Sequence, residues 1–182
     1  MNHRIHIFGP SGSGCSTLGR ALATHIATQH FDADDFYFQP SDPPFQTRRP
    51  VEDRYRLMQD VFVPRSDWVL SGSVDSWDGV VRDRFTHVFR LELDKDIRHA
   101  RLVNRDQRRH GAAVQPGGAM YQQSQDFLKW ADGYEAGDRP GRSLARHKTW
   151  EQTLNCPVHV LNSEQPLAMM VSEVLMHLDR DG

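Results

Sequence analysis

The sequence predicts a single α/β domain in which a parallel sheet of five strands is covered by helices on both faces. Three observations lead to this fold class. Short apolar segments alternate with amphipathic ones along almost the whole chain. A glycine-rich loop joins the first apolar segment to the first amphipathic one, and the 182 residues suffice for one ordinary core. Ligands of such folds bind at the carboxyl ends of the strands.

Five apolar segments have the length and composition of buried strands. They span residues 5–8, 30–32, 68–70, 86–93 and 157–161. The loops after the first, second, third and fifth of these segments carry glycine, serine or acidic residues. In a parallel sheet these loops all fall on one edge, which is therefore the predicted site.

Helices are predicted between the strands, and the clearest spans residues 16–28, where large aliphatic residues recur every four positions. Asp94 or Asp96 is the expected N-cap of the helix that follows the fourth strand. A glycine-rich segment at residues 108–118 is expected to interrupt the pattern. The remaining helices are expected at residues 51–63, 75–84, 119–134, 142–154 and 166–178.

Composition argues against several classes of function. The net charge of −2 gives no overall attraction to nucleic acid, and no apolar run approaches the roughly 20 residues that cross a membrane. The N-terminal segment is not expected to be a signal peptide, because its apolar run is only a few residues long and a glycine interrupts it. Cys15 and Cys156 match no metal-binding spacing, and we expect a reducing, cytoplasmic setting. We also expect a monomer or homodimer without nucleic-acid or membrane partners. Arginines far outnumber lysines, which suits a grip on phosphate, although a GC-rich genome produces the same bias.

The segment GPSGSGCST at residues 9–17 has the frame of a phosphate-binding loop, G-x-x-x-x-G-K-[ST], with Cys15 in the lysine position. Its glycines let backbone N–H groups converge on an anion, and the helix N-terminus behind them adds partial positive charge. Losing the lysine is expected to weaken phosphate binding by about tenfold to a hundredfold. The phosphate-binding candidates are Gly9, Ser11, Gly12, Ser13, Gly14, Cys15, Ser16 and Thr17.

Three interpretations of this loop are open. Phosphate binds and another cation replaces the lysine, or nucleotide binds without transfer, or the loop only turns the chain from strand to helix. A thiol at a helix N-terminus also tends to have a lowered pKa. Cys15 is accordingly either redox-sensitive or a small residue that fills space.

Two further segments carry chemistry. The acidic stretch FDADDF at residues 31–36 follows the second strand, where one carboxylate can support Mg²⁺ and another can accept a proton from a substrate hydroxyl. A solvated turn or a helix cap is the alternative. Arginines crowd residues 98–109, where a mobile lid could close over a triphosphate. A solvated helix face, or contact with nucleic acid, would explain the same arginines.

The loop, the acidic stretch, SGS at residues 71–73 and RLVNR at residues 101–105 occur in an order that resembles the small P-loop kinases of the adenylate, shikimate and gluconate kinase type. The resemblance implies a three-layer α/β/α P-loop NTPase fold over residues 1–182. It implies ATP and Mg²⁺ as cofactors, phosphoryl transfer to a small hydroxylated metabolite, an acceptor-binding region at about 36–64 and a lid at about 106–120. Cys15 departs from the pattern, so a nucleotide-binding regulator or weak ATPase, or an interaction module without nucleotide, is the alternative.

The resemblance also implies roles for individual residues. Ser16 and Asp32 would hold the metal, and Asp34 would contact the acceptor hydroxyl. Arg101 and Arg105 would act near the nucleotide. The acceptor region lacks the arginine signatures of a nucleoside monophosphate site, so adenylate kinase activity is not expected. The other candidates are Arg108 and Arg109 for the lid, Asn162 and Ser163 for adenine, and Asp34, Asp35, Arg49, Arg54, Ser73 and Tyr121 for the acceptor.

Overall fold

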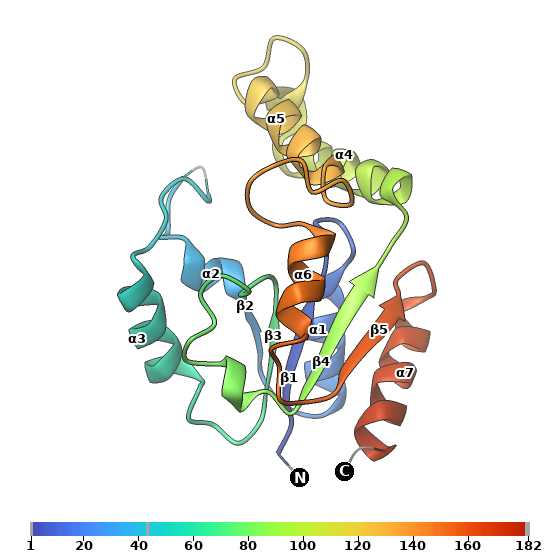
Figure 1. Cartoon of the computed structure of the whole chain (residues 1–182). Coiled ribbons are helices and arrows are strands. Elements are labelled where there is room, and N and C mark those ends of the chain that lie inside the picture. The colour runs from blue at the N-terminus through green and yellow to red at the C-terminus, as the bar shows by residue number, and fades with distance from the viewer. Residues whose placement is uncertain (1, 43, 181–182) are drawn as a thin grey trace.

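A computed structural model of the chain describes residues 2–42 and 44–180 and contains the predicted parallel sheet (Figure 1). The strands follow the order β2-β3-β1-β4-β5, and every ladder is parallel. The α/β class and the five-stranded sheet are thus confirmed. The strands are β1 (Arg4–Phe8), β2 (His30–Asp32), β3 (Trp68–Ser71), β4 (His87–Glu92) and β5 (Val158–Asn162).

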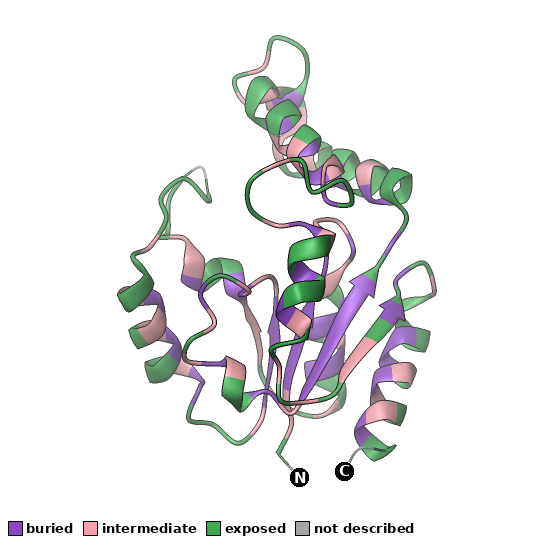
Figure 2. Ribbon diagram, in the orientation of Figure 1, coloured by how far each residue is buried: buried purple, intermediate pink, exposed green. Residues whose placement is uncertain are grey.

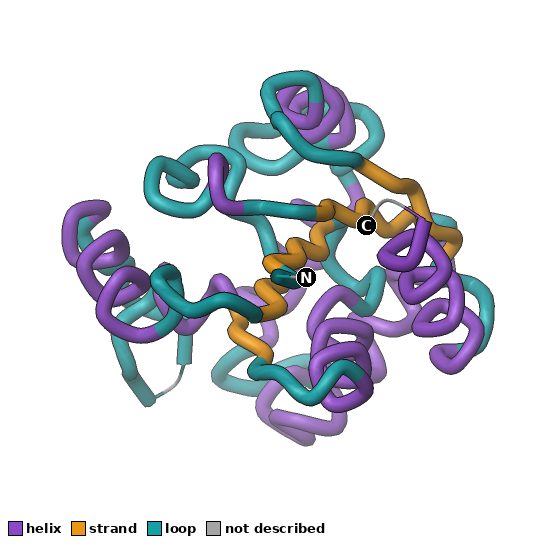
Figure 3. Tube along the Cα trace, turned by 90° about the horizontal axis from the view of Figure 1, so that it is seen from below, coloured by secondary structure: helices purple, strands orange, loops and turns teal. Residues whose placement is uncertain are grey.

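Helices lie on both sides of the strands, as the view along the sheet shows (Figure 3). No helix in the described part of the chain is long and apolar enough to cross a membrane. Two 3₁₀ helices complete the fold, η1 (Arg82–Arg84) and η2 (Gly111–Val114). The α-helices are α1 (Cys15–His25), α2 (Ala33–Tyr37), α3 (Val51–Val61), α4 (Lys95–His110), α5 (Tyr121–Asp132), α6 (Leu144–Glu151) and α7 (Leu167–Arg180).

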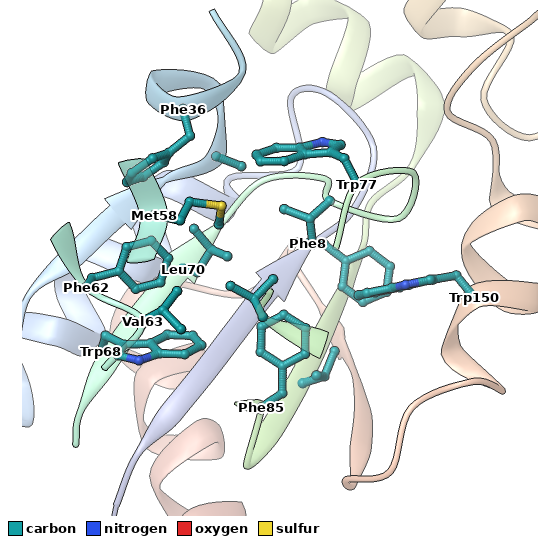
Figure 4. Packing of buried hydrophobic residues seen from close by; sticks show 14 residues of the cluster. Phe8, Phe36, Met58, Phe62, Val63, Trp68, Leu70, Trp77, Phe85 and Trp150 are labelled. Atoms are coloured by element: carbon teal, nitrogen blue, oxygen red, sulfur yellow. The ribbon is translucent and has the colours of Figure 1, made fainter. Parts of the chain in front are cut away.

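The central strands β3, β1 and β4 are buried along nearly their whole length (Figure 2). Because successive side chains point to opposite faces, each strand feeds two cores. Ile5 and Ile7 of β1 pack into the cluster under α1 and α7. Phe8 packs on the other face with Trp150 of α6 and Trp77 (Figure 4). The two cores pack against opposite faces of the sheet and leave its carboxyl edge free for the site.

The helix predicted at residues 75–84 is wrong. The chain there makes successive turns, and helical hydrogen bonding appears only in η1. The apolar residues Val74, Trp77 and Val81 have helix-like spacing, but the turns alone bring them into the core. Gly79 packs so tightly that an added Cβ would lie 3.1 Å from the Tyr55 hydroxyl. Burial of the turn, rather than of one helix face, produces the periodic pattern.

Helices α4 and α5 form a hairpin beyond the carboxyl ends of the strands (Figure 1). Asp94 caps α4, as predicted, and its Oδ1 accepts from the N–H groups of Asp96 and Ile97 at 2.8 and 3.2 Å. The helix continues to His110, beyond the break expected at residue 108. The hairpin has its own apolar cluster, which is separate from the two clusters of the sheet. That cluster consists of the buried Leu102, Leu128 and Ala131 with Phe127 and Trp130 packed against them.

A buried arginine anchors the base of the hairpin. Arg98 is 1% exposed and donates to the Leu93 carbonyl at 3.2 Å. It also donates to the Ala131 carbonyl at 3.5 Å and pairs with Glu135 at 2.5 Å. The guanidinium of Arg98, on α4, therefore contacts both α5 and the residue just before α4 at the base of the hairpin.

A second buried polar group, His6 of β1, is expected to make the fold sensitive to acid. Burial lowers the pKa of His6 to about 3, and its Nδ1 donates to the Leu70 carbonyl at 3.1 Å. The ring is neutral in the folded chain, whereas in the unfolded chain it titrates near 6.5. Its stabilising contribution is therefore complete above pH 6.5 and is lost as the pH falls below that value.

We expect His6 alone to lower the free energy of unfolding by about 1.4 kcal/mol for each pH unit below 6.5. Urea denaturation between pH 7.5 and 5.0 measures this slope. His6→Phe, which cannot titrate, should reduce the slope by this amount and leave the part due to His147 and His30, whose pKa values burial also lowers, while His25→Gln, at an exposed position, should leave it unchanged. Equal slopes for the wild type and His6→Phe would contradict the assignment.

Candidate active site

The loop between β1 and α1 has the geometry of an anion cradle. Gly12 and Gly14 adopt φ of +87° and +95°, a left-handed conformation that favours glycine. The Ser13 N–H donates to the Pro10 carbonyl at 3.1 Å, which closes the turn. Within the described part of the chain, the N–H groups of Gly12 and Gly14 donate to no protein acceptor. They are available to an anion at the N-terminus of α1.

This loop borders a cleft of about 740 Å³ at the carboxyl edge of the sheet. All of the predicted phosphate-binding residues line it, and so do six of the other predicted site residues. Those six are Asp32, Asp34, Arg101, Arg105, Arg109 and Ser163. Asn162 does not line the cleft, because its Oδ1 turns back to accept from the Glu164 N–H at 2.9 Å. Pro10, Gly72 and Leu102, which belong to the quoted motifs, also line the cleft, and the lining residues that the sequence did not indicate are Arg20, Arg142, Met170 and residues 164–167.

Cys15 is not the activated thiol that its position suggested. Burial raises its pKa to about 11, and this effect outweighs the hydrogen bond from Ser13 and the charge of Arg142, which both lower it. The two side chains are close, with Ser13 Oγ 3.4 Å from Cys15 Sγ. The expectation of a lowered pKa is therefore wrong for this cysteine, and the structure favours the space-filling interpretation.

Ser16 and Asp32 are brought together at the floor of the cleft. Ser16 Oγ donates to Asp32 Oδ2 at 2.6 Å, and Ser71 at the end of β3 donates to Ser16 at 3.4 Å. The other oxygen of Asp32 accepts from the Asp34 N–H at 3.1 Å and caps α2. The cap of α2 and the hydrogen bond to Ser16 therefore use different oxygens of one carboxylate. No cluster of three or more His, Cys, Asp or Glu in the described ranges could hold a metal by itself.

Asp34 has the electrostatics of a potential base. The cleft walls remove part of its hydration and raise the pKa of its carboxyl, and the charges of Asp32 and Asp35 act in the same direction. Arg142 and Arg105 oppose this shift. Burial also raises the pKa of Asp35, although less of that side chain is enclosed. A carboxylate with a raised pKa is a stronger proton acceptor than an ordinary aspartate.

A second cleft, of about 910 Å³, opens between the hairpin and the loop after α2. Its walls combine aromatic side chains with both signs of charge. Aromatic and apolar contacts come from Phe38, Phe45, Phe127, Trp130 and Met120, and charged ones from Asp35, Arg48 and Asp106, while His110 also lines the cleft. The two clefts meet at one junction. It is lined by Ser11, Ser16, Asp32, Asp34, Arg105, Arg109 and Arg142, which border both clefts.

The loop after α2 folds back on itself as a narrow hairpin. Residue 43, which belongs to the predicted acceptor region, lies outside the described residues. Phe38 pairs with Arg48 across the loop, and the ring of Phe38 meets that of Phe45 edge to face, with the centroids 5.3 Å apart. Arg49 Nε and Nη2 donate to the carbonyls of Phe36 and Phe38 at 3.0 and 3.1 Å. Arg49 therefore binds the backbone of the loop and lines neither cleft.

Arg54 is placed in the same way. Its side chain is 7% exposed, donates to the Arg49 carbonyl at 2.7 Å and stacks over Tyr37 at 3.9 Å. Arg49 and Arg54, the two arginines predicted to bind the acceptor, therefore stabilise the loop through hydrogen bonds to backbone carbonyls. Arg48, between the loop and the cleft, takes the position expected of them.

Three other predicted residues also lie outside the two clefts. Ser73 donates to Asp75 at 2.7 Å and is bonded to the buried His147 at 2.9 Å. Tyr121 opens α5, where its neighbour Met120 lines the cleft instead. Arg108 lines neither cleft; it borders a separate shallow depression on α4 together with Arg101, Arg105 and Arg109.

Comparison with known proteins supports both the fold and a family. No family model matches the chain. It is 35% identical over 178 residues, covering 98% of each chain, to YqaC of Bacillus subtilis strain 168, which is described as an uncharacterized protein.

Solved structures of small kinases resemble it over almost their whole length. The shikimate kinase of Bacteroides thetaiotaomicron matches with a TM-score of 0.60 at 16% identity, covering 98% of this chain and 99% of that one. A gluconokinase of Sinorhizobium meliloti 1021 matches at 0.54 and 17%, covering 98% and 93%. Identities this low concern the fold, and the chain has the three-layer fold of the small P-loop kinases.

The raised pKa of Cys15 leads to a direct test. At pH 8 only about one thiol in a thousand is ionised. We expect the rate of alkylation by iodoacetamide, followed by mass spectrometry in a Cys156→Ser background, to rise about tenfold per pH unit up to at least pH 10. An unstructured cysteine peptide, which titrates near 8.5, is the control. A plateau below pH 9 would show that the helix N-terminus dominates after all.

Proposed function

Because the chain belongs to the YqaC family and has the fold of the small P-loop kinases, we propose that it transfers a phosphoryl group from ATP to a hydroxylated small molecule. The observation that carries this proposal is the junction of the two clefts. Nucleotide would occupy the 740 Å³ cleft and the acceptor the 910 Å³ cleft. The acid Asp34 and three arginines stand where the two substrates would meet.

The donor set at the phosphate loop supports nucleotide with Mg²⁺. Free N–H groups at Gly12 and Gly14 suit phosphate oxygens, and the N-terminus of α1 favours negative charge there. Ser16 and Asp32 supply two adjacent oxygens, the ligand type that Mg²⁺ prefers when phosphates and waters complete its shell. The ion would neutralise charge on the phosphates. A cytoplasmic setting fits the two free cysteines and the supply of ATP.

The walls of the second cleft describe its occupant. The aromatic side chains Phe38, Phe45 and Phe127 favour a flat or apolar portion of the acceptor. Arg48 in the same wall favours a negative group on the acceptor. We therefore expect an acceptor that combines a hydroxyl, an apolar or ring portion and an anionic group.

The transfer itself needs one proton acceptor. The acceptor oxygen forms a bond to the γ-phosphorus, the bond from that phosphorus to the leaving ADP oxygen breaks, and the hydroxyl proton passes to the carboxylate of Asp34. Arg105 and Arg109 on the α4 face would offset charge that develops on the transferred group. The other residues hold the two substrates in line.

Two measurements separate this proposal from its alternative. A kinase is stabilised by MgATP, by about 2.7 kcal/mol at a hundred times Kd, and forms a phosphorylated product from a panel of hydroxylated anionic metabolites. Stabilisation without turnover on any acceptor would favour a nucleotide-binding regulator, which the missing lysine at Cys15 also suits. An absence of stabilisation at millimolar MgATP would exclude both.

Asp34→Asn should lower kcat by at least about a hundredfold while MgATP binding stays intact, because only the proton acceptor is lost. Asp60→Asn, on the exposed surface of α3, is the matched control. A variant as active as the wild type would refute the role of Asp34.

The same carboxylate sets the pH dependence. Asp34 acts when ionised, and its pKa is raised, so kcat/KM should fall as the pH drops through a value above the ordinary aspartate pKa of about 3.9. Initial rates from pH 4 to 8 locate this acid limb. A limb that stays unchanged in Asp34→Asn would assign it to another group.

A further inference from the structure

The segment between α5 and α6, residues 133–143, brings an arginine to the phosphate loop from a distant part of the sequence. We propose that Arg142 supplies the positive charge that Cys15 cannot, and binds the β- and γ-phosphates of the nucleotide. This inference deepens the proposed function and rests on it. In the common form of the loop that charge comes from a lysine at the position of Cys15.

Arg142 touches the loop directly. Its Nη1 lies 3.5 Å from Ser11 Oγ, across 131 positions of sequence. The half-buried side chain borders the nucleotide cleft and the acceptor cleft together. A guanidinium at this junction faces the place where the terminal phosphates and the acceptor would meet.

The electrostatic effect of Arg142 on Cys15 and Asp34 also places its charge at the junction of the two clefts. Among the charged groups that act on Cys15, Arg142 is the strongest, and it lowers the pKa of the thiol. It is also the strongest charge that acts on Asp34. The guanidinium therefore lies near both the vacant lysine position and the proposed proton acceptor.

The other arginines of the cleft are less suited to this role. Arg101 donates to the Ser163 carbonyl at 3.3 Å, and Arg105 lies 3.7 Å from Asp106. The field of Arg20 falls on His30 and Asp35 rather than on Cys15. Arg109 borders both clefts from the hairpin and, among the described residues, makes no hydrogen bond or ion pair with the phosphate loop. Arg142 is the one whose partner belongs to the loop itself.

Local structure holds Arg142 in position. Ser143 directly after it caps α6 by accepting from the Arg146 N–H at 3.2 Å. Gly141 directly before it has φ of +98°, and the Pro140 carbonyl accepts from Trp130 Nε1 at 3.3 Å. The backbone is thus fixed on both sides, by α6 and by α5. An arginine so held offers a planar fork of donors to phosphate.

The experiment is a double-mutant cycle read by calorimetric titration with MgATP. Arg142→Ala should weaken binding by about tenfold to a hundredfold, the effect of one charge-assisted contact. Adding Cys15→Lys to that variant should restore most of the loss, because the lysine delivers charge to the same phosphates. Arg139→Ala, on the same segment but lining a separate depression, should bind as the wild type does.

Each outcome decides the matter. Equal affinity of Arg142→Ala and the wild type, or a loss that Cys15→Lys does not repair, overturns the role of Arg142 and leaves the kinase proposal standing. A wild type that binds no MgATP at millimolar concentration refutes the kinase proposal itself and this inference with it. Arg142→Gln, which keeps the length of the side chain but not the charge, replaces Arg142→Ala if the latter fails to fold.

Discussion

The parallel pairing of β1 with β3 on one side and β4 on the other is the constraint on which the site depends. It brings the ends of β1, β2 and β3 to one edge, where the phosphate loop, Asp32 and Ser71 meet. The hydrogen bonds from Ser71 to Ser16 and from Ser16 to Asp32 then link three strands across that edge. Because each central strand is buried on both faces, the edge cannot shift without disturbing two cores.

The geometry of a phosphate-binding loop is a property of the backbone more than of one side chain. Two left-handed glycines and a helix N-terminus persist although the lysine is replaced by Cys15. A lysine in the loop would carry its charge on the same short segment as the backbone donors. Here the charges come from α4 and from residues 133–143, so binding would depend on tertiary structure that the motif alone does not contain.

Strand and helix order, the loop and its acidic neighbour could be predicted because each depends on local pattern or on a short-range turn. Arg49 and Arg54 looked like acceptor residues from their place in the acceptor region, but only the fold shows that their donors go to backbone carbonyls. Arg142 was missed for the opposite reason. Nothing near it in the sequence marks a site, and its partner Ser11 is 131 residues away. The turns at residues 74–81 were mistaken for a helix because burial of a turn imitates helical spacing.

The separate cluster of the α4–α5 hairpin has a thermodynamic consequence. The chain contains a large cooperative unit around the sheet and a small one around Leu102, Leu128 and Ala131. A unit with so few buried residues opens at a lower free energy than the global one, and amide exchange reads the two separately. The hairpin can therefore fray or reclose around a bound molecule while the sheet stays folded. Arg98 at its base marks the boundary between the two units.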